Sequence, residues 1–133
     1  MWSEISPPAH RLSERARLAI ELAVAQWVLC PQVAARSYVR LKHMGVSAEE
    51  IENYRRANAS DPATRSLLRF AVAVIITRGK LDPTDRRRLD PVFAGDPAAI
   101  VKAACAALAL CITTSALALD PEAPDIDMKI GDY

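Results

Sequence analysis

The chain has 133 residues, 51% of them hydrophobic, and its 17 basic and 16 acidic residues leave a formal net charge of +1. This length suits one domain with its own core, and the balanced charge offers no electrostatic basis for binding nucleic acid or an anionic membrane. The opening residues lack the apolar stretch of a signal peptide, so we expect a protein of the reducing cytoplasm.

Capping signals predict the first two helices. Ser13 is a good N-cap for a helix that runs to about Leu29. Pro31 suits the first position of a second helix that runs to about Met44, because proline needs no N–H there. Gly45 suits the left-handed residue that ends such a helix.

A third helix is predicted to follow immediately. The run Ser47-Ala48-Glu49-Glu50 matches a capping box, in which the serine caps the helix and the glutamate at N3 reaches back to the serine N–H. The helical pattern fades near Ala57. We therefore expect a short helix between two loops.

Asp-Pro pairs mark the later elements, because aspartate caps helices and proline fits their first position. Three of the five pairs precede helical patterns, at residues 62–78, 83–89 and 97–119, and the other two are expected to mark turns. No stretch alternates with the period of a strand. The predicted fold class is all-α, with about six helices.

We expect a single helical domain over residues 12–119, preceded by a loose arm (1–11) and followed by an acidic, extended tail (120–133). Residues 103–119 carry no charge, and the length of this uncharged stretch is near the lower limit for a membrane span. Their alanine-rich composition also suits the centre of a soluble bundle, and this interpretation is preferred, with no membrane contact.

The helices at 62–78 and 97–119 are apolar on more than one face, which predicts burial from several sides. Such burial favours an obligate homo-oligomer, so the first expected partner is a second copy of this chain.

Cys30 is the residue with the clearest route to chemistry. It precedes Pro31 at a helix start, where the helix dipole and free N–H groups favour a thiolate. Cys105 and Cys111 are six residues apart on one helix, so they point about 120° apart, and we interpret both as small core residues. The two histidines and three cysteines never fall at metal-ligand spacing, so we expect no metal and no cofactor.

The chain resembles the alkylhydroperoxidase D-like, or carboxymuconolactone decarboxylase, family over roughly residues 12–119. The resemblance lies in the helix that follows Leu12, in Cys30, in the Gly-Val-Ser-x-Glu-Glu-Ile run from Gly45, and in the Leu-Leu-Arg-Phe-Ala run from Leu67. It implies an all-helical protein that assembles as a dimer, trimer or hexamer.

Peroxidatic members of that family carry a glutamate, a Cys-x-x-Cys pair and a histidine. One thiolate attacks the peroxide, the second cysteine resolves the sulfenic acid, and the other two groups move protons. By this resemblance, Cys30 matches the first cysteine, whereas Leu18, Val33 and Ser37 stand at the glutamate, second-cysteine and histidine positions. The decarboxylase branch keeps the histidine, so Ser37 counts against that activity as well.

Three other residues are candidate helpers. Glu21 lies one helical turn from the glutamate position, although its spacing from Glu14 and Arg17 is typical of a solvent-exposed stripe, the interpretation we prefer. Ser37 and Tyr38 stand about two turns after the cysteine and offer hydroxyls as proton donors, but such hydroxyls more often bind a backbone carbonyl or water.

The leading functional hypothesis is residual thiol-based redox chemistry at Cys30, such as hydroperoxide reduction with an external thiol as reductant. The alternative is a catalytically inactive, oligomeric binding or scaffold protein of the same fold. A decarboxylase-like activity is the weaker third hypothesis.

Overall fold

The computed structural model describes residues 12–84 and 97–117, and within these ranges the fold is all-helical, as predicted. The helices are α1 (Glu14–Trp27), α2 (Pro31–His43), α3 (Ala48–Arg55), α4 (Pro62–Thr77) and α6 (Pro97–Ala116). Of the helix expected over 83–89, Pro83 and Thr84 are helical, and the remainder lies outside the described residues. The predicted arm, tail and turn at Asp90-Pro91 also lie outside them.

Side-chain caps begin three of the helices, as the sequence predicts. Ser13, Ser47 and Asp61 each accept a hydrogen bond from the backbone N–H three residues later, at 3.0, 3.1 and 2.8 Å. Each bond satisfies one of the N–H groups that a helix leaves free at its start.

The second half of the predicted capping box is wrong. The Glu50 carboxylate does not turn back to Ser47; it accepts hydrogen bonds from the Ser60 N–H and hydroxyl at 3.1 and 3.0 Å and from the Asn53 amide at 3.0 Å. Burial raises the pKa of the Glu50 carboxyl, but these hydrogen bonds lower it more, so it lies below the ordinary 4.5. Glu50 therefore ties α3 to the connection that leads into α4.

Glu50 is expected to make the fold acid-sensitive. Because its pKa is lower in the folded than in the unfolded chain, the ionised carboxylate stabilises the fold above its unfolded pKa, and this contribution is lost as the pH falls through the folded pKa. We predict that Glu50→Gln lowers Tm at pH 7 and makes the fall in Tm between about pH 5 and 3 shallower. Circular dichroism melts across this pH range measure both effects. The exposed Glu49→Gln is the control, and an equal change in that variant would contradict the prediction.

The first four helices share one type of C-terminus. A left-handed residue follows each helix, with φ between 56° and 90°, and the residue after it donates its N–H to the carbonyl five positions back at 2.8–3.1 Å. This is the Schellman motif. Glycine occupies the left-handed position only after α2, at Gly45; the others are Leu29, Ala57 and Arg78. The helices consequently end one or two residues earlier than predicted.

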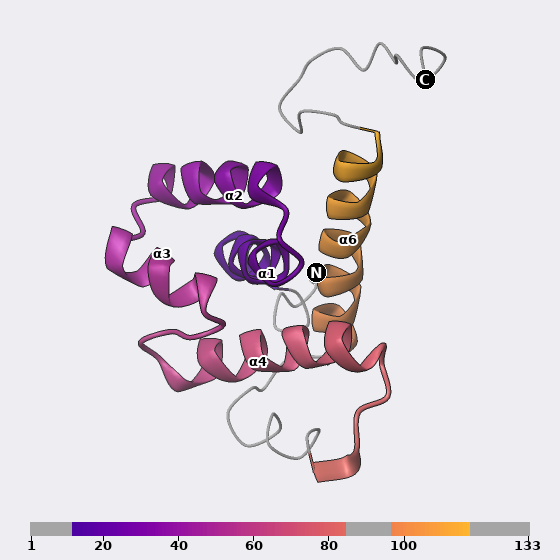
Figure 1. Cartoon of the computed structure of the whole chain (residues 1–133). Helices are drawn as coiled ribbons and strands as arrows, with labels where there is room; N and C mark the ends of the chain where they lie inside the picture. The colour runs from indigo at the N-terminus through magenta and orange to yellow at the C-terminus, as the bar shows by residue number, and fades with distance from the viewer. Residues whose placement is uncertain (1–11, 85–96, 118–133) are drawn as a thin grey trace, which may run out of the picture.

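Helix α1 is the centre of the molecule. Figure 1 looks along it and shows α2, α3, α4 and α6 arranged around it. Every residue from 18 to 25 is buried, and α1 contacts each of the other four helices. A helix that is buried on all sides needs apolar side chains on all faces, and every residue of this segment except Glu21 is apolar.

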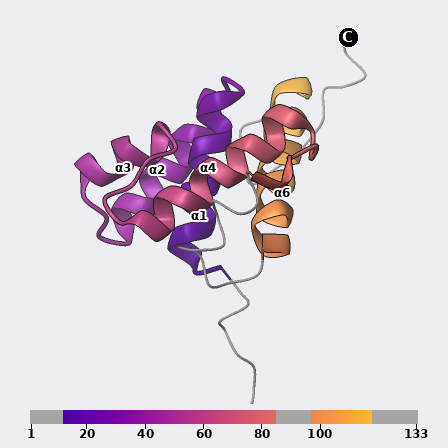
Figure 2. The ribbon, with the colours of Figure 1, turned by 90° about the horizontal axis from the view of Figure 1, so that it is seen from below.

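Helix α6 lies at one edge of this arrangement (Figure 2). It packs through one stripe of residues at helical spacing, namely Ile100, Ala104, Ala107, Cys111 and Thr114. Its most apolar stretch is only 28% buried, so the prediction that this helix is buried from several sides is wrong for the single chain. By length and composition alone, α6 could also cross a membrane.

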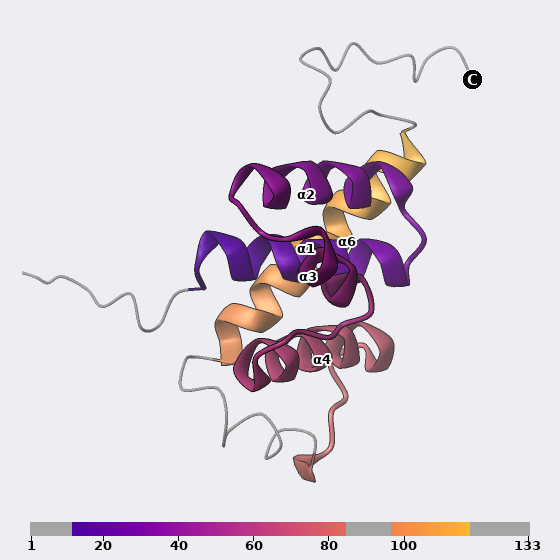
Figure 3. The ribbon, with the colours of Figure 1, turned by 90° about the vertical axis from the view of Figure 1, so that its left-hand side faces the viewer.

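Helix α2 lies along one side of α1, and α4 lies along the opposite side (Figure 3). The turn from α1 into α2 is tight, because only three residues separate the two helices, namely Val28, the left-handed Leu29, and Cys30. This junction, with α6 beside it, positions the candidate site.

Candidate functional site

Cys30 has two structural roles at once. Its N–H donates to the Ala25 carbonyl at 2.8 Å and completes the end of α1, while its own carbonyl accepts from the Ala34 N–H at 3.1 Å and starts α2. Pro31 follows as the first residue of α2, as predicted. The backbone of Cys30 is therefore held from both sides, and its side chain is 2% exposed.

Three polar groups surround the Cys30 sulfur. The Ser115 hydroxyl on α6 lies 3.8 Å from Sγ and is oriented to donate to it. The Cys30 thiol is in turn oriented to donate to Gln32 Oε1 at 3.8 Å and to the Cys111 carbonyl oxygen at 3.9 Å. The serine hydroxyl that reaches the sulfur is thus on α6, and neither Ser37 nor Tyr38 has this role.

Cys111 brings a second thiol to this position. It is buried on the inner stripe of α6, and its main-chain carbonyl oxygen lies 3.9 Å from the Cys30 sulfur, although 81 positions separate the two residues in the sequence. Burial is the main cause that raises the pKa of the Cys111 thiol to about 12, and the neighbouring Cys30 raises it further. This thiol is therefore protonated at neutral pH.

The interpretation of Cys105 and Cys111 as core residues is confirmed for Cys111 and wrong for Cys105, which is exposed. Only one face of α6 packs against the bundle, and the two positions lie on different faces. The inward position of Cys111 could have been found from the three- and four-residue spacing that links it to Ala104, Ala107 and Thr114.

Glu21 and Ser37 form a buried polar pair between α1 and α2. The Ser37 hydroxyl donates to Glu21 Oε1 at 2.7 Å, and Arg36 Nη1 lies 3.4 Å from the same oxygen. Glu21 is 7% exposed, so its placement in a solvent-exposed stripe is wrong, whereas Glu14 and Arg17 form an exposed ion pair. The difference arises because α2 covers the Glu21 side of α1 and supplies hydrogen-bond donors to the carboxylate.

The apolar residues at the relay positions belong to the core. Leu18 and Val33 are 2% and 0% exposed, so neither has a polar group or solvent contact to offer. The negative charge of Glu21 is the smallest of the causes that raise the pKa of the Cys111 thiol.

Tyr38 contacts α3 through Arg55. The Arg55 guanidinium of α3 lies over its ring, 5.5 Å from the centroid, and also donates to Gln26 Oε1 at 3.0 Å. The tyrosine therefore takes part in a cation–π contact between α2 and α3. Trp27, which the sequence also places beside Cys30, is 57% exposed and does not line the pocket at this junction.

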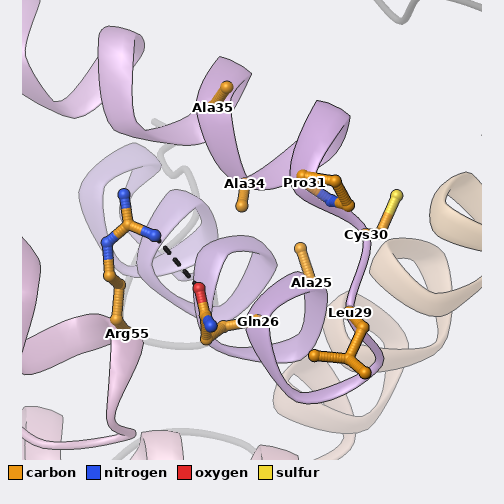
Figure 4. A pocket seen from close by; sticks show the side chains of 8 residues that line it. All are labelled: Ala25, Gln26, Leu29, Cys30, Pro31, Ala34, Ala35 and Arg55. Carbon is orange, nitrogen blue, oxygen red and sulfur yellow. Dashed lines mark hydrogen bonds between the residues drawn. The ribbon is translucent and has the colours of Figure 1, made fainter.

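An open pocket of about 550 Å³ adjoins Cys30 (Figure 4). Its lining is mostly apolar and consists of Ala25, Gln26, Leu29, Cys30, Pro31, Ala34, Ala35 and Arg55. In Figure 4 the sulfur of Cys30 projects away from Arg55, on the side where α6 lies. The cysteine therefore forms one edge of the pocket, and its thiol is directed between the pocket and α6.

No group of three or more metal-ligating side chains occurs among the described residues.

Comparisons with protein families, curated proteins and solved structures find no match to this chain. The resemblance to the alkylhydroperoxidase D-like family therefore stays a prediction, and the geometry of Cys30, Cys111 and Ser115 carries the functional argument.

Loss of the Ser37 hydroxyl is expected to destabilise the junction. Ser37→Ala leaves the buried Glu21 carboxylate without its shortest hydrogen bond, and we predict a loss of about 1–3 kcal/mol in the free energy of unfolding. Urea denaturation measures this loss. Replacement of the exposed Thr113 by alanine serves as the control, and an equal effect there would show that the Ser37–Glu21 bond contributes nothing.

Proposed function

We propose that this protein is a diverged relative of the alkylhydroperoxidase D-like proteins that carries out thiol-based redox chemistry at Cys30, with a small hydroperoxide as the oxidant. The supporting observation is the position of this thiol. It stands at the N-terminal end of α2 and at the edge of a pocket of about 550 Å³, with a hydroxyl 3.8 Å from its sulfur.

The helix position favours the reactive form of the thiol. The first N–H groups of α2 and the positive end of its dipole favour a negative charge at the N-cap, and the Cys30 side chain makes no cap hydrogen bond to these N–H groups. The Ser115 hydroxyl adds a donor that strengthens as the sulfur becomes an anion. The apolar pocket offers a route for a small organic hydroperoxide.

The proposed reaction begins with the oxidation of Cys30. The Cys30 thiolate attacks the terminal oxygen of the hydroperoxide, the O–O bond breaks, and one proton is taken up to release an alcohol. Cys30 is thereby oxidised to the sulfenic acid. A thiol then attacks the sulfenic sulfur, which forms a disulfide and releases water. An external thiol reduces this disulfide by exchange and so returns Cys30 to the thiol.

We test this function with hydroperoxide consumption by the purified protein in the presence of dithiothreitol. Cys30→Ser is expected to abolish the protein-dependent rate, whereas Cys105→Ser, which removes the exposed cysteine of α6, leaves it unchanged. Dimedone, which traps sulfenic acids, should label Cys30 alone. A rate in Cys30→Ser equal to that of the unaltered protein would overturn the proposal.

A second candidate, a non-catalytic oligomeric binding or scaffold protein, is favoured by two observations. The Cys30 side chain is only 2% exposed, and α6 leaves an uncharged face uncovered, with Ile112 57% exposed. We propose a cytoplasmic homo-oligomer in either case. Absence of hydroperoxide consumption together with a stable oligomer in light scattering would favour the scaffold, and a monomer at micromolar concentration would contradict the oligomer.

No observation favours the decarboxylase activity, since Ser37 is buried and bound to Glu21.

A further inference from the structure

The contact between Cys30 and Cys111 joins two distant parts of the chain. Cys30 lies between α1 and α2, and Cys111 lies in the C-terminal half of α6. The Cys30 sulfur is 3.9 Å from the Cys111 carbonyl oxygen, and Cys30 is near enough to help raise the pKa of the Cys111 thiol. The remaining cysteine, Cys105, is exposed and takes no part in this contact.

Both residues are held on rigid elements. Cys30 is fixed by the two main-chain hydrogen bonds that end α1 and begin α2. Cys111 is an interior residue of a helix of 20 residues, with Thr114 and Ala107 beside it on the packed stripe. A pair of side chains on such supports meets without a rearrangement of loops, which favours a reaction between them.

The surroundings of the two thiols are asymmetric. Cys30 has the start of α2 and the Ser115 hydroxyl to stabilise a thiolate, and it borders the pocket. Cys111 has none of these, and burial raises the pKa of its thiol to about 12. The pair therefore contains one thiol at the edge of the pocket and one buried thiol that is protonated at neutral pH.

The low exposure of Cys30 also favours a resolving thiol from within the chain. With the Cys30 side chain only 2% exposed, a small hydroperoxide reaches it more readily than a bulky thiol does. Cys111 already contacts it, and a tethered group in contact acts at a far higher effective concentration than a free one.

We propose that Cys111 is the resolving cysteine of this protein and forms a reversible intramolecular disulfide with Cys30. The inference rests on the proposed function for its first step, the oxidation of Cys30 by a hydroperoxide. The Cys111 sulfur then attacks the sulfenic sulfur, the S–O bond breaks, and the displaced hydroxide leaves as water with the thiol proton of Cys111. An external thiol later reduces the disulfide by exchange.

Peptide mapping of the full-length protein tests the pair. The reduced protein is treated with equimolar hydrogen peroxide or, separately, with diamide, which oxidises neighbouring thiols without a sulfenic acid. Free thiols are then blocked with iodoacetamide before digestion and mass spectrometry. We expect a Cys30–Cys111 cross-linked peptide under both conditions, with Cys105 alkylated.

Two variants sharpen the result. Cys111→Ser should accumulate sulfenic acid on Cys30, trapped by dimedone at a level at least several-fold above that of the unaltered protein. Cys105→Ser should form the Cys30–Cys111 cross-link as before, and it excludes cross-links through the exposed cysteine. The mapping itself needs no variant, so it remains decisive if Cys111→Ser folds poorly.

The outcomes separate the two proposals. A cross-link with diamide but no reaction with peroxide supports the pair and overturns hydroperoxide reduction. Sulfenic acid on Cys30 of the unaltered protein, without a Cys30–Cys111 cross-link under either condition, supports hydroperoxide reduction and overturns the resolving role of Cys111. An unmodified Cys30 under both conditions overturns both.

Discussion

Leu22→Ala is expected to lower the free energy of unfolding by about 2–5 kcal/mol, the range for leucine truncation in a packed core. Leu22 is 0% exposed and lies within the fully buried stretch of α1, the helix that contacts all the others. Removing its side chain leaves a cavity that none of the surrounding helices can fill without shifting against its neighbours. A small domain has a total stability of only about 5–15 kcal/mol, so this single loss is a large part of it.

Urea denaturation followed by circular dichroism measures this effect. The matched control is Ile76→Ala on α4, where the side chain is 52% exposed and we expect a loss of about 1 kcal/mol or less. Equal losses in the two variants would contradict the central role of α1 in the packing.

The second large effect concerns the oxidised protein. A Cys30–Cys111 disulfide would close a loop between residues 81 positions apart. The chain-entropy relation for such a loop predicts that the oxidised form is more stable than the reduced form by about 4–5 kcal/mol. The bond would also fasten α6, which packs through a single stripe, to the junction of α1 and α2.

Denaturation of the diamide-treated and the fully reduced protein measures this difference. Cys111→Ser should show the same stability under both conditions, because it lacks the pair. An oxidised protein that carries the cross-link but is no more stable than the reduced protein would show that the bond strains the fold.

Under the proposed function, the second thiol does not come from the position where the family resemblance expects it. Val33 stands where the resemblance places the second cysteine, and it is fully buried among apolar side chains. In our proposal the second sulfur comes from α6 instead, because this helix lies beside Cys30 (Figure 4) and contacts its sulfur through Cys111 and Ser115. The buried Glu21–Ser37 pair then helps to hold α2 against α1.

The uncovered face of α6 is consistent with the predicted oligomer. Its exposed residues carry no charge from 103 to 117, so its burial against a second copy would desolvate no ionised side chain. An oligomer would also account for an apolar helix that the single chain covers on one side only.

The local sequence was sufficient to predict the helices and their starts. The caps at Ser13, Ser47 and Asp61 and the prolines at the first positions of α2 and α4 act within one helical turn. Their partners are backbone groups three or four residues away, so the sequence alone contains the whole interaction. The helix ends were predicted less well, because leucine, alanine and arginine occupy left-handed positions that usually take glycine.

Only the tertiary structure decided which polar and sulfur-bearing side chains meet. Glu21 has the spacing of a surface residue, but it is bound to Ser37 of α2. Glu50 binds Ser60 beyond the end of its own helix, and Cys111 lies beside Cys30 although 81 positions separate them. Each of these contacts depends on how two helices pack, and a helix sequence shows which face is apolar without showing which neighbour covers it. The sequence identified Cys30 as the candidate thiol, and the packing of α6 supplied its partner.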